Sequence, residues 1–302
     1  APDASASPSP PASIASVAPL PPLETPLRDS LAMLRQRADA GEPAAACRLA
    51  AEFEYCHQIR YRLVAASEAL QEQERLRFDT ATGLSEEARQ NMRDMMAANS
   101  ERLLKESEHC ENVPLSTAAE RVHYWRLSAL GGSTPALRHY AVGNAFRLNE
   151  TLDNLDALAV YRREAEALAW RGAASGDLHT GLALASALSP RRNELRRYFL
   201  AQAVQPDKVK ALALYLHLKR QLESAPAALG GLRAQIEQQS AELLVDLDAS
   251  AEARARELAA GYARDWTPVP RDSFVMPPPG ARGTPDTARA ECSRPVAGRT
   301  TG

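Results

Sequence analysis

The tetrapeptides Ala38-Asp39-Ala40-Gly41, Ala129-Leu130-Gly131-Gly132 and Ala173-Ala174-Ser175-Gly176 begin one spaced pattern that occurs three times in this chain. Four residues after each glycine the pattern has a small residue, and eight after it a large residue followed by alanine. These positions are Ala45, Leu49 and Ala50, then Ala136, Tyr140 and Ala141, then Thr180, Leu184 and Ala185. A glycine that closes one helix, followed by small and large residues at helical spacing in the next, predicts a closely packed helix-turn-helix unit. Because no such unit can bury its apolar face alone, the units are expected to stack into an α-solenoid.

Composition limits both the fold and the partners. The chain has 302 residues, of which 45% are hydrophobic but only 5% aromatic, so its core must be built largely from alanine and leucine. Such a composition favours closely packed helices over strands. The net charge of −2 gives no general attraction to nucleic acid or to an anionic membrane. No apolar stretch approaches the roughly 18 residues that a transmembrane segment requires.

The first residues, Ala1-Pro2-Asp3-Ala4-Ser5-Ala6-Ser7-Pro8, are typical of a chain from which a signal peptide has been removed beside small residues. A trimmed fragment is the alternative. Proline, alanine and serine are also common in tethers between a membrane and a folded body. We therefore expect a periplasmic or secreted protein in an oxidising compartment.

Prolines divide the chain into a body and two flanks. Of 21 prolines, eight lie in residues 1–26 and seven in 268–302. These flanks have little apolar periodicity and cannot bury enough surface to offset the entropy of ordering. We predict a disordered Pro/Ala/Ser-rich linker at 1–26, a helical-repeat domain at 27–266 and a disordered Pro/Arg-rich tail at 267–302. Removal of both flanks should then change the melting temperature by only a few degrees.

The periodic segments of the body are all predicted to be helices, and no stretch alternates apolar and polar residues as a strand would. The predicted helices lie at about 27–40, 43–78, 85–111, 116–130, 134–148, 153–174, 177–188, 191–203, 207–223, 227–247 and 250–265. The predicted fold class is therefore all-α. Between Pro43 and Gly83 there is neither glycine nor proline. The long helices on both sides of a turn at 80–84 are expected to form an antiparallel hairpin, inserted into the solenoid at about 57–112.

The pattern Ala-x-x-Gly-x-x-x-Ala-x-x-x-Leu-Ala resembles the Sel-one-like repeat, a relative of the tetratricopeptide repeat. Asp207-Lys208-Val209-Lys210-Ala211-Leu212 is similar to the step with which such repeats often open a new helix. The resemblance covers about 38–60, 120–188 and 205–265, and it departs from the family where Leu-Ala or Tyr-Ala replaces Leu-Gly. It implies a scaffold that holds other proteins, often in bacterial envelopes, and it implies no chemistry.

The four cysteines are Cys47, Cys56, Cys110 and Cys292. If the hairpin turns near 82–83, Cys56 and Cys110 face each other at its base, where a disulfide would fasten the insertion to the solenoid. Closing a loop of about 55 residues stabilises a fold by roughly 4 kcal/mol on chain-entropy grounds. Cys47 lies about 13 Å from Cys56 along a continuous helix, too far for a bridge. Cys47 is interpreted as a small buried residue, while Cys292 is either free or bonded to Cys47.

A structural zinc site is the alternative at the base of the hairpin. Cys56-His57 and His109-Cys110 together supply the two cysteines and two histidines that such a site uses. Adjacent helical residues, however, point about 100° apart, so the four side chains converge only if the helices unwind locally. Thiols of an exported protein also tend to be oxidised. We therefore predict the disulfide, with no metal and no other cofactor.

No catalytic motif appears in the sequence: there is no Gly-x-Ser-x-Gly, His-Glu-x-x-His, phosphate loop or dinucleotide fingerprint. The acid pairs Glu52 and Glu54, and Glu86 and Glu87, lie on predicted helices rich in arginine and glutamine. We interpret both pairs as solvated faces, and we expect a protein that is not an enzyme. The alternative is a helical envelope enzyme that cleaves peptidoglycan, which requires a glutamate with a raised pKa in a deep groove.

Four arginines are the main candidates for partner binding. They are Arg191, Arg192, Arg196 and Arg197. Because they lie within two helical turns, their guanidinium groups could together bind a carboxylate-rich peptide or an anionic envelope polymer. The alternative is that they form an ordinary solvated helix face without a partner. Tyr161 is a further candidate, with a place in the core as its alternative. We expect the partner to be another protein, bound on the concave face of the solenoid; a purely structural role in an envelope complex is the third hypothesis.

Overall fold

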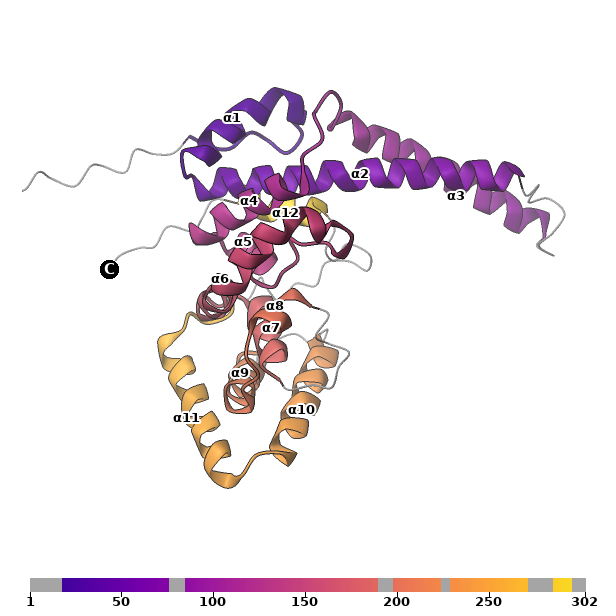
Figure 1. The fold of residues 1–302 in the computed structure, drawn as a ribbon. Coiled ribbons are helices and arrows are strands. Elements are labelled where there is room, and N and C mark those ends of the chain that lie inside the picture. Colours follow the sequence, from indigo (N-terminus) through magenta and orange to yellow (C-terminus); the bar gives the residue numbers. More distant parts are fainter. Residues whose placement is uncertain (1–17, 76–84, 190–197, 224–228, 271–284, 295–302) are drawn as a thin grey trace, which may run out of the picture.

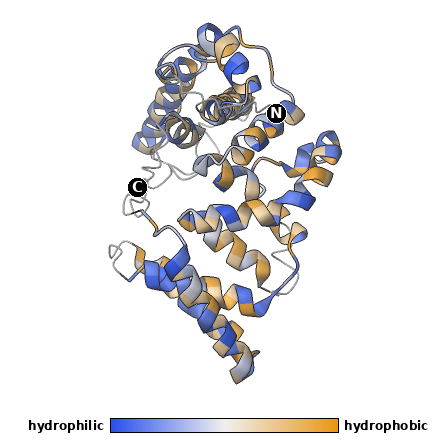
Figure 2. Ribbon diagram, turned by 90° about the vertical axis from the view of Figure 1, so that its left-hand side faces the viewer, coloured by the Kyte–Doolittle hydropathy of each residue, from blue (hydrophilic) through white to orange (hydrophobic). Residues whose placement is uncertain are grey.

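The computed structural model describes residues 18–75, 85–189, 198–223, 229–270 and 285–294, and every regular element within these ranges is helical. The elements are α1 (Leu27–Asp39), α2 (Pro43–Arg75), α3 (Glu86–Glu108), α4 (Ala118–Leu130), α5 (Thr134–Ala136), the π-helical η1 (Leu137–Ala141), the 3-10 helices η2 (Leu148–Glu150) and η3 (Leu152–Asn154), α6 (Leu155–Ala174), α7 (Leu178–Leu188), α8 (Phe199–Ala203), α9 (Lys208–Gln221), α10 (Gly230–Val245), α11 (Ala249–Asp265) and α12 (Pro285–Ser293). The all-α prediction is confirmed. Figure 2 shows hydrophobic and hydrophilic residues interspersed along the helices, as expected where one side of a helix is buried. No helix of the described ranges is both long and apolar enough to cross a bilayer.

The three repeated glycines end helices, as the pattern predicts. Gly41, Gly132 and Gly176 have φ angles of 89°, 88° and 83°, in the left-handed region that favours glycine. In each copy the glycine N–H donates to the carbonyl three residues before it, and the next N–H donates to the carbonyl five residues before that N–H. This pair of bonds is the Schellman closure of a helix. The small and large positions that follow are fully buried: Ala45, Leu49, Ala136, Tyr140, Thr180 and Leu184.

Successive helix pairs pack on one another. α1 packs against α2, α4 against α5 and η1, and α6 against α7. The second member of each pair also contacts a helix farther along the chain, since α2 contacts α4, η1 contacts α6 and α7 contacts α9. α10 and α11 then lie on either side of α9 at the end of the molecule (Figure 1).

The helix predicted at 134–148 is shorter than expected. It begins as α5, continues as η1 and ends at Ala141. Gly143, with a φ of 91°, closes it by a fourth pair of Schellman bonds, from Gly143 N–H to Tyr140 O and from Asn144 N–H to His139 O. The chain then passes through η2 and η3 before α6 begins.

The predicted long hairpin is built from α2, of 33 residues, and α3, of 23 residues. The second half of α2 and α3 extend from the body as two helices, which we call the arm (Figure 1). A disulfide joins Cys56 to Cys110 at the base of the arm, with an S–S distance of 2.03 Å and a Cα–Cα distance of 5.5 Å. The predicted disulfide is therefore confirmed, and the zinc alternative is wrong because both sulfur atoms are used. The turn predicted at 80–84 lies outside the described residues.

The prediction of a disordered tail is wrong for residues 285–293. They form α12, which packs against α2, and Cys292 is bonded to Cys47 with a Cα–Cα distance of 5.3 Å. The N-terminal segment is also held to the body, since Arg37 Nη1 donates to Pro19 O at 3.1 Å. The helical body thus includes residues from both predicted flanks. α12 is covalently linked to α2 and the segment before α1 is hydrogen-bonded to the body, so removal of the flanks is no longer expected to be harmless.

We expect Gly176→Ala to destabilise the fold by about 3 kcal/mol and Gly132→Ala by only about 1 kcal/mol. Both substitutions force alanine into the left-handed region. A Cβ at Gly176 would also lie 2.7 Å from Pro268 O and 2.9 Å from Thr267 O, whereas a Cβ at Gly132 would have no neighbour within 4 Å. Urea denaturation of the two variants measures the difference. Equal losses would show that the contact with residues 267–268 does not constrain the turn.

Candidate functional site

α2 carries two buried carboxyl groups, Glu52 and Glu54, which are only 1% and 6% exposed. Their interpretation as a solvated face is therefore wrong, because α1, α4 and α12 pack against α2. Two positions along a helix correspond to about 200° of rotation. The two carboxylates consequently project toward nearly opposite sides of α2, and each lies in its own polar cluster.

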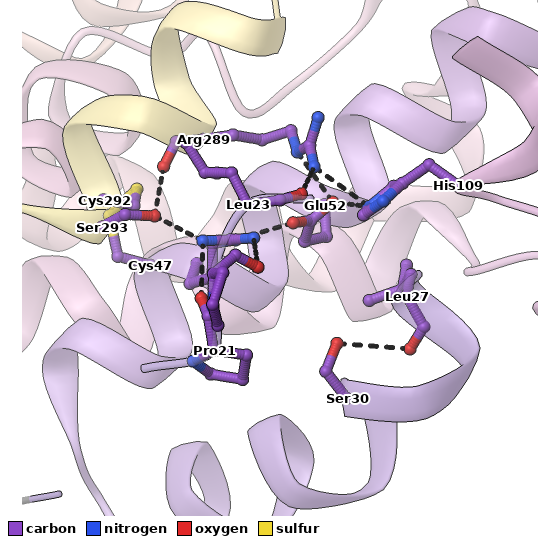
Figure 3. A network of polar contacts seen from close by, with 12 residues as sticks. Pro21, Leu23, Leu27, Ser30, Cys47, Glu52, His109, Arg289, Cys292 and Ser293 are labelled. Atoms are coloured by element: carbon purple, nitrogen blue, oxygen red, sulfur yellow. Dashed lines mark hydrogen bonds and ion pairs between the residues drawn. A yellow bond between two sulfur atoms is a disulfide. The ribbon is translucent and has the colours of Figure 1, made fainter. Parts of the chain in front are cut away.

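The first cluster, which we call the terminal clasp, surrounds Glu52 (Figure 3). Its members are Arg48, Glu52, His109 and Arg289. Glu52 Oε1 accepts a hydrogen bond from Arg48 Nε at 2.6 Å. Glu52 Oε2 lies 2.8 Å from His109 Nε2 and 2.9 Å from Arg289 Nε. One carboxylate thus joins α2, α12 and the end of α3.

The two arginines of the terminal clasp also bind oxygen atoms outside it. Arg289 Nη2 donates to Leu23 O at 2.8 Å. Arg48 Nη1 donates to Ser293 Oγ and lies 3.5 Å from Pro21 O. The clasp therefore fixes the N-terminal segment, α2 and α12 to one another beside the Cys47–Cys292 disulfide (Figure 3).

The terminal clasp holds Glu52 in its ionised form. Burial alone would raise the pKa of this carboxyl group, but the hydrogen bond with His109 and the positive charges of Arg289 and Arg48 outweigh burial and lower the pKa of Glu52 below its usual range. A general acid that cleaves a glycosidic bond requires the opposite shift. The geometry of Glu52 therefore suits a structural role rather than acid catalysis.

The second cluster, which we call the arm-base cluster, joins α2, α4 and η2. Its members are Glu54, His57, Arg121, Arg147 and Glu150. Each of the two arginines contacts both glutamates, with Arg121 Nε at 3.7 Å from Glu54 Oε1 and Arg147 Nη1 at 3.5 Å from Glu150 Oε1. His57 Nε2 lies 4.0 Å from Glu150 Oε1. Burial and the charges of Arg147 and Arg121 lower the pKa of His57, so at pH 7 this histidine is neutral and two arginines balance two glutamates.

Of the five predicted partner-binding residues, the structure describes only Tyr161. Its side chain is fully buried, and its hydroxyl donates to Ala141 O at 2.9 Å. Tyr161 therefore belongs to the core, and the prediction that it binds a partner is wrong. The four arginines, Arg191, Arg192, Arg196 and Arg197, lie outside the described residues.

Sequence reasoning missed the terminal clasp. Arg48 and Glu52 have the four-residue spacing of an ordinary surface ion pair, and nothing in the local sequence connects them with Arg289. The even number of cysteines is the one usable signal. Once Cys56 and Cys110 are paired, Cys292 is the remaining partner for Cys47, which would place residues near Cys292 against α2.

Exposed apolar side chains gather around the arm-base cluster. Twelve large hydrophobic side chains of the described residues are exposed, and six of them lie on α2 beyond His57, in the loop before α4, or between η2 and the start of α6. These six form what we call the arm-base surface, and each is at least 57% exposed: Tyr61, Val64, Leu115, Leu148, Leu152 and Leu155. Large exposed apolar patches mark interaction sites in soluble proteins. The arm-base surface is therefore the candidate binding site.

Comparison of the chain with protein-family models, with curated proteins and with solved structures finds no match. Within the described ranges, no three His, Cys, Asp or Glu side chains are grouped in a way that could hold a metal ion. In the candidate site, the carboxylates of the arm-base cluster are paired with arginines, and the apolar side chains around the cluster are exposed.

Proposed function

We propose that this protein is a non-enzymatic scaffold of the bacterial envelope that binds another protein. The arm-base surface carries this proposal, because six large apolar side chains remain exposed on elements that meet at the arm-base cluster. The buried carboxylates of the two clusters, Glu52 and Glu54, form ion pairs with arginine or histidine side chains. These ion pairs suit a role in stabilising the fold. The sequence alone placed the partner on a concave face, whereas the exposed side chains favour the base of the arm.

We further propose that the body is a solenoid of the Sel-one-like and tetratricopeptide-like kind. Three helix pairs, each joined by a left-handed glycine, support this assignment, as does the packing of each pair on a helix farther along the chain. Such solenoids present extended surfaces to other proteins, so the architecture agrees with a scaffold. The arm is then an insertion that adds its own surface to the solenoid.

Two disulfides support export to the periplasm or to the outside of the cell. Disulfides persist in oxidising compartments and are rare where thiols are kept reduced.

The proposed function is tested by capture followed by purified binding. The oxidised chain, immobilised and exposed to envelope extract, should retain a protein that, once purified, binds the chain saturably. A parallel incubation with purified peptidoglycan should release no soluble fragments. The proposal is overturned if no purified candidate binds saturably, or if the purified wild-type chain releases peptidoglycan fragments, which would favour the enzymatic alternative.

A further inference from the structure

The chemistry of the arm-base surface narrows the kind of partner. We propose that this surface binds an amphipathic helix of a partner protein, with lysine or arginine beside the apolar face of that helix. This inference rests on the proposed function and deepens it by assigning the binding site and the partner chemistry.

One face of α2 supplies the first half of the surface. His57, Arg60, Tyr61 and Val64 fall within about 100° of the helix circumference. His57 faces Glu150 at 4.0 Å, and Arg60 Nη2 donates to Val113 O in the loop that carries Leu115. Tyr61 and Val64 follow on the same face, about 6 and 10 Å farther along the helix axis than His57. His57 and Arg60 are thus the last residues on this face of α2 that contact η2 and the loop before α4. The apolar side chains that follow them are exposed.

The segment from η2 to the start of α6 supplies the second half. Leu148, Leu152 and Leu155 begin the three successive elements η2, η3 and α6, and all three side chains are exposed. Glu150, within the same segment, is tied to α2 and α4 through the arm-base cluster. Two apolar rows, one on the arm and one on the body, thus lie next to each other at the base of the arm. A helix with apolar residues at every third or fourth position presents the matching row.

Acidic side chains accompany these apolar rows. Asp153 and Asp156 are exposed beside Leu152 and Leu155, and Glu68 is exposed on the α2 face of Val64. None of the three forms an ion pair with another described side chain. Basic residues on the partner would pair with these three carboxylates, whereas a second copy of this surface would bring like charges together. The unpaired carboxylates therefore favour a basic amphipathic helix.

The test uses the full oxidised chain and two synthetic helical peptides of about 18 residues, or five turns. Both peptides carry the same leucine row; one has lysine and the other glutamate at the flanking positions. Fluorescence anisotropy should show saturable binding of the lysine peptide and at least about tenfold weaker binding of the glutamate peptide. The double variant Leu148→Ser/Leu152→Ser should lose about tenfold or more in affinity for the lysine peptide. Asp153→Lys/Asp156→Lys should reverse the preference between the two peptides.

Val245→Ser provides the matched control, because Val245 is 86% exposed on α10, outside the arm-base surface. Its affinity for the lysine peptide should equal that of the wild type. Equal binding by wild type and Leu148→Ser/Leu152→Ser overturns the inference, as does failure of both peptides to bind. A dimer that is lost in this double variant would instead assign the surface to a second copy. A partner identified by capture could bind Leu148→Ser/Leu152→Ser as tightly as it binds the wild type. The assignment of the arm-base surface as the binding site would then be wrong, whereas the scaffold function would still be supported.

Discussion

Replacing Cys47 and Cys292 together by serine is expected to lower the free energy of unfolding by about 5 kcal/mol, because loop-closure entropy grows with loop length. This disulfide spans a sequence separation of 245 residues, against 54 for Cys56–Cys110. In a chain of this size the loss corresponds to a decrease of about 10–20 °C in melting temperature. Removal of residues 271–302 should cost a comparable amount, since it also removes Arg289 from the terminal clasp.

Urea denaturation without reductant measures this loss. The double serine variant retains Cys56 and Cys110, so non-reduced peptides from both proteins should show those two residues joined. This control separates the loss of the clasp disulfide from general misfolding. A change below about 1 kcal/mol would contradict the prediction and show that non-covalent contacts alone hold α12 on α2.

Replacing Glu52 by alanine is expected to cost about 3–5 kcal/mol, because removing one partner of a buried ion pair leaves the other charges uncompensated. The side chains of Arg48 and Arg289 are only 2% and 8% exposed and would lose their shared carboxylate. Glu257→Ala is the matched control, since Glu257 is exposed on α11 and its loss should change stability by no more than about 0.5 kcal/mol. Similar effects of the two substitutions would show that the terminal clasp contributes little.

The Glu52 variant should also have a weaker dependence of stability on pH in acid. The pKa of Glu52 is lower in the folded chain than its ordinary value of 4.5, so its folded state holds fewer protons than its unfolded state as the pH falls below that value. The contribution of this carboxylate is therefore complete at neutral pH and is lost as the pH falls through the folded-state pKa. Unfolding free energies of wild type and Glu52→Ala measured across this range should converge as the pH decreases.

The helices of the body follow from local signals in the sequence. Pro43 and Gly41 mark the junction of α1 and α2, and the predicted helix at 153–174 corresponds to Leu155–Ala174 in the structure. The disulfide at the base of the arm was also predictable, because an antiparallel hairpin fixes which residues of its two helices are opposite each other. In these cases the relevant residues are either neighbours along the chain or lie opposite each other in one helical hairpin.

The candidate site was predictable only in part. The sequence indicated an interaction protein, but Tyr161 lies in the core because Tyr140 and Phe146 pack against its ring. The apolar residues of the arm-base surface gave no such signal. Leu148 and Leu152 have the same spacing as buried residues elsewhere in the chain, and only the arrangement of α2, α4 and η2 leaves them exposed.

The sequence by itself determined the helical class and the three glycine closures, which depend on local backbone conformation, and the Cys56–Cys110 bridge, which depends on the register of a single helical hairpin. The tertiary structure alone decided the position of α12 and the burial of Glu52. A helix of nine residues is too short to be stable in isolation, so α12 depends on its contacts with α2 and on Cys47. Glu52 is buried rather than solvated because segments from both ends of the chain cover it, and this coverage depends on long-range contacts that no local pattern records.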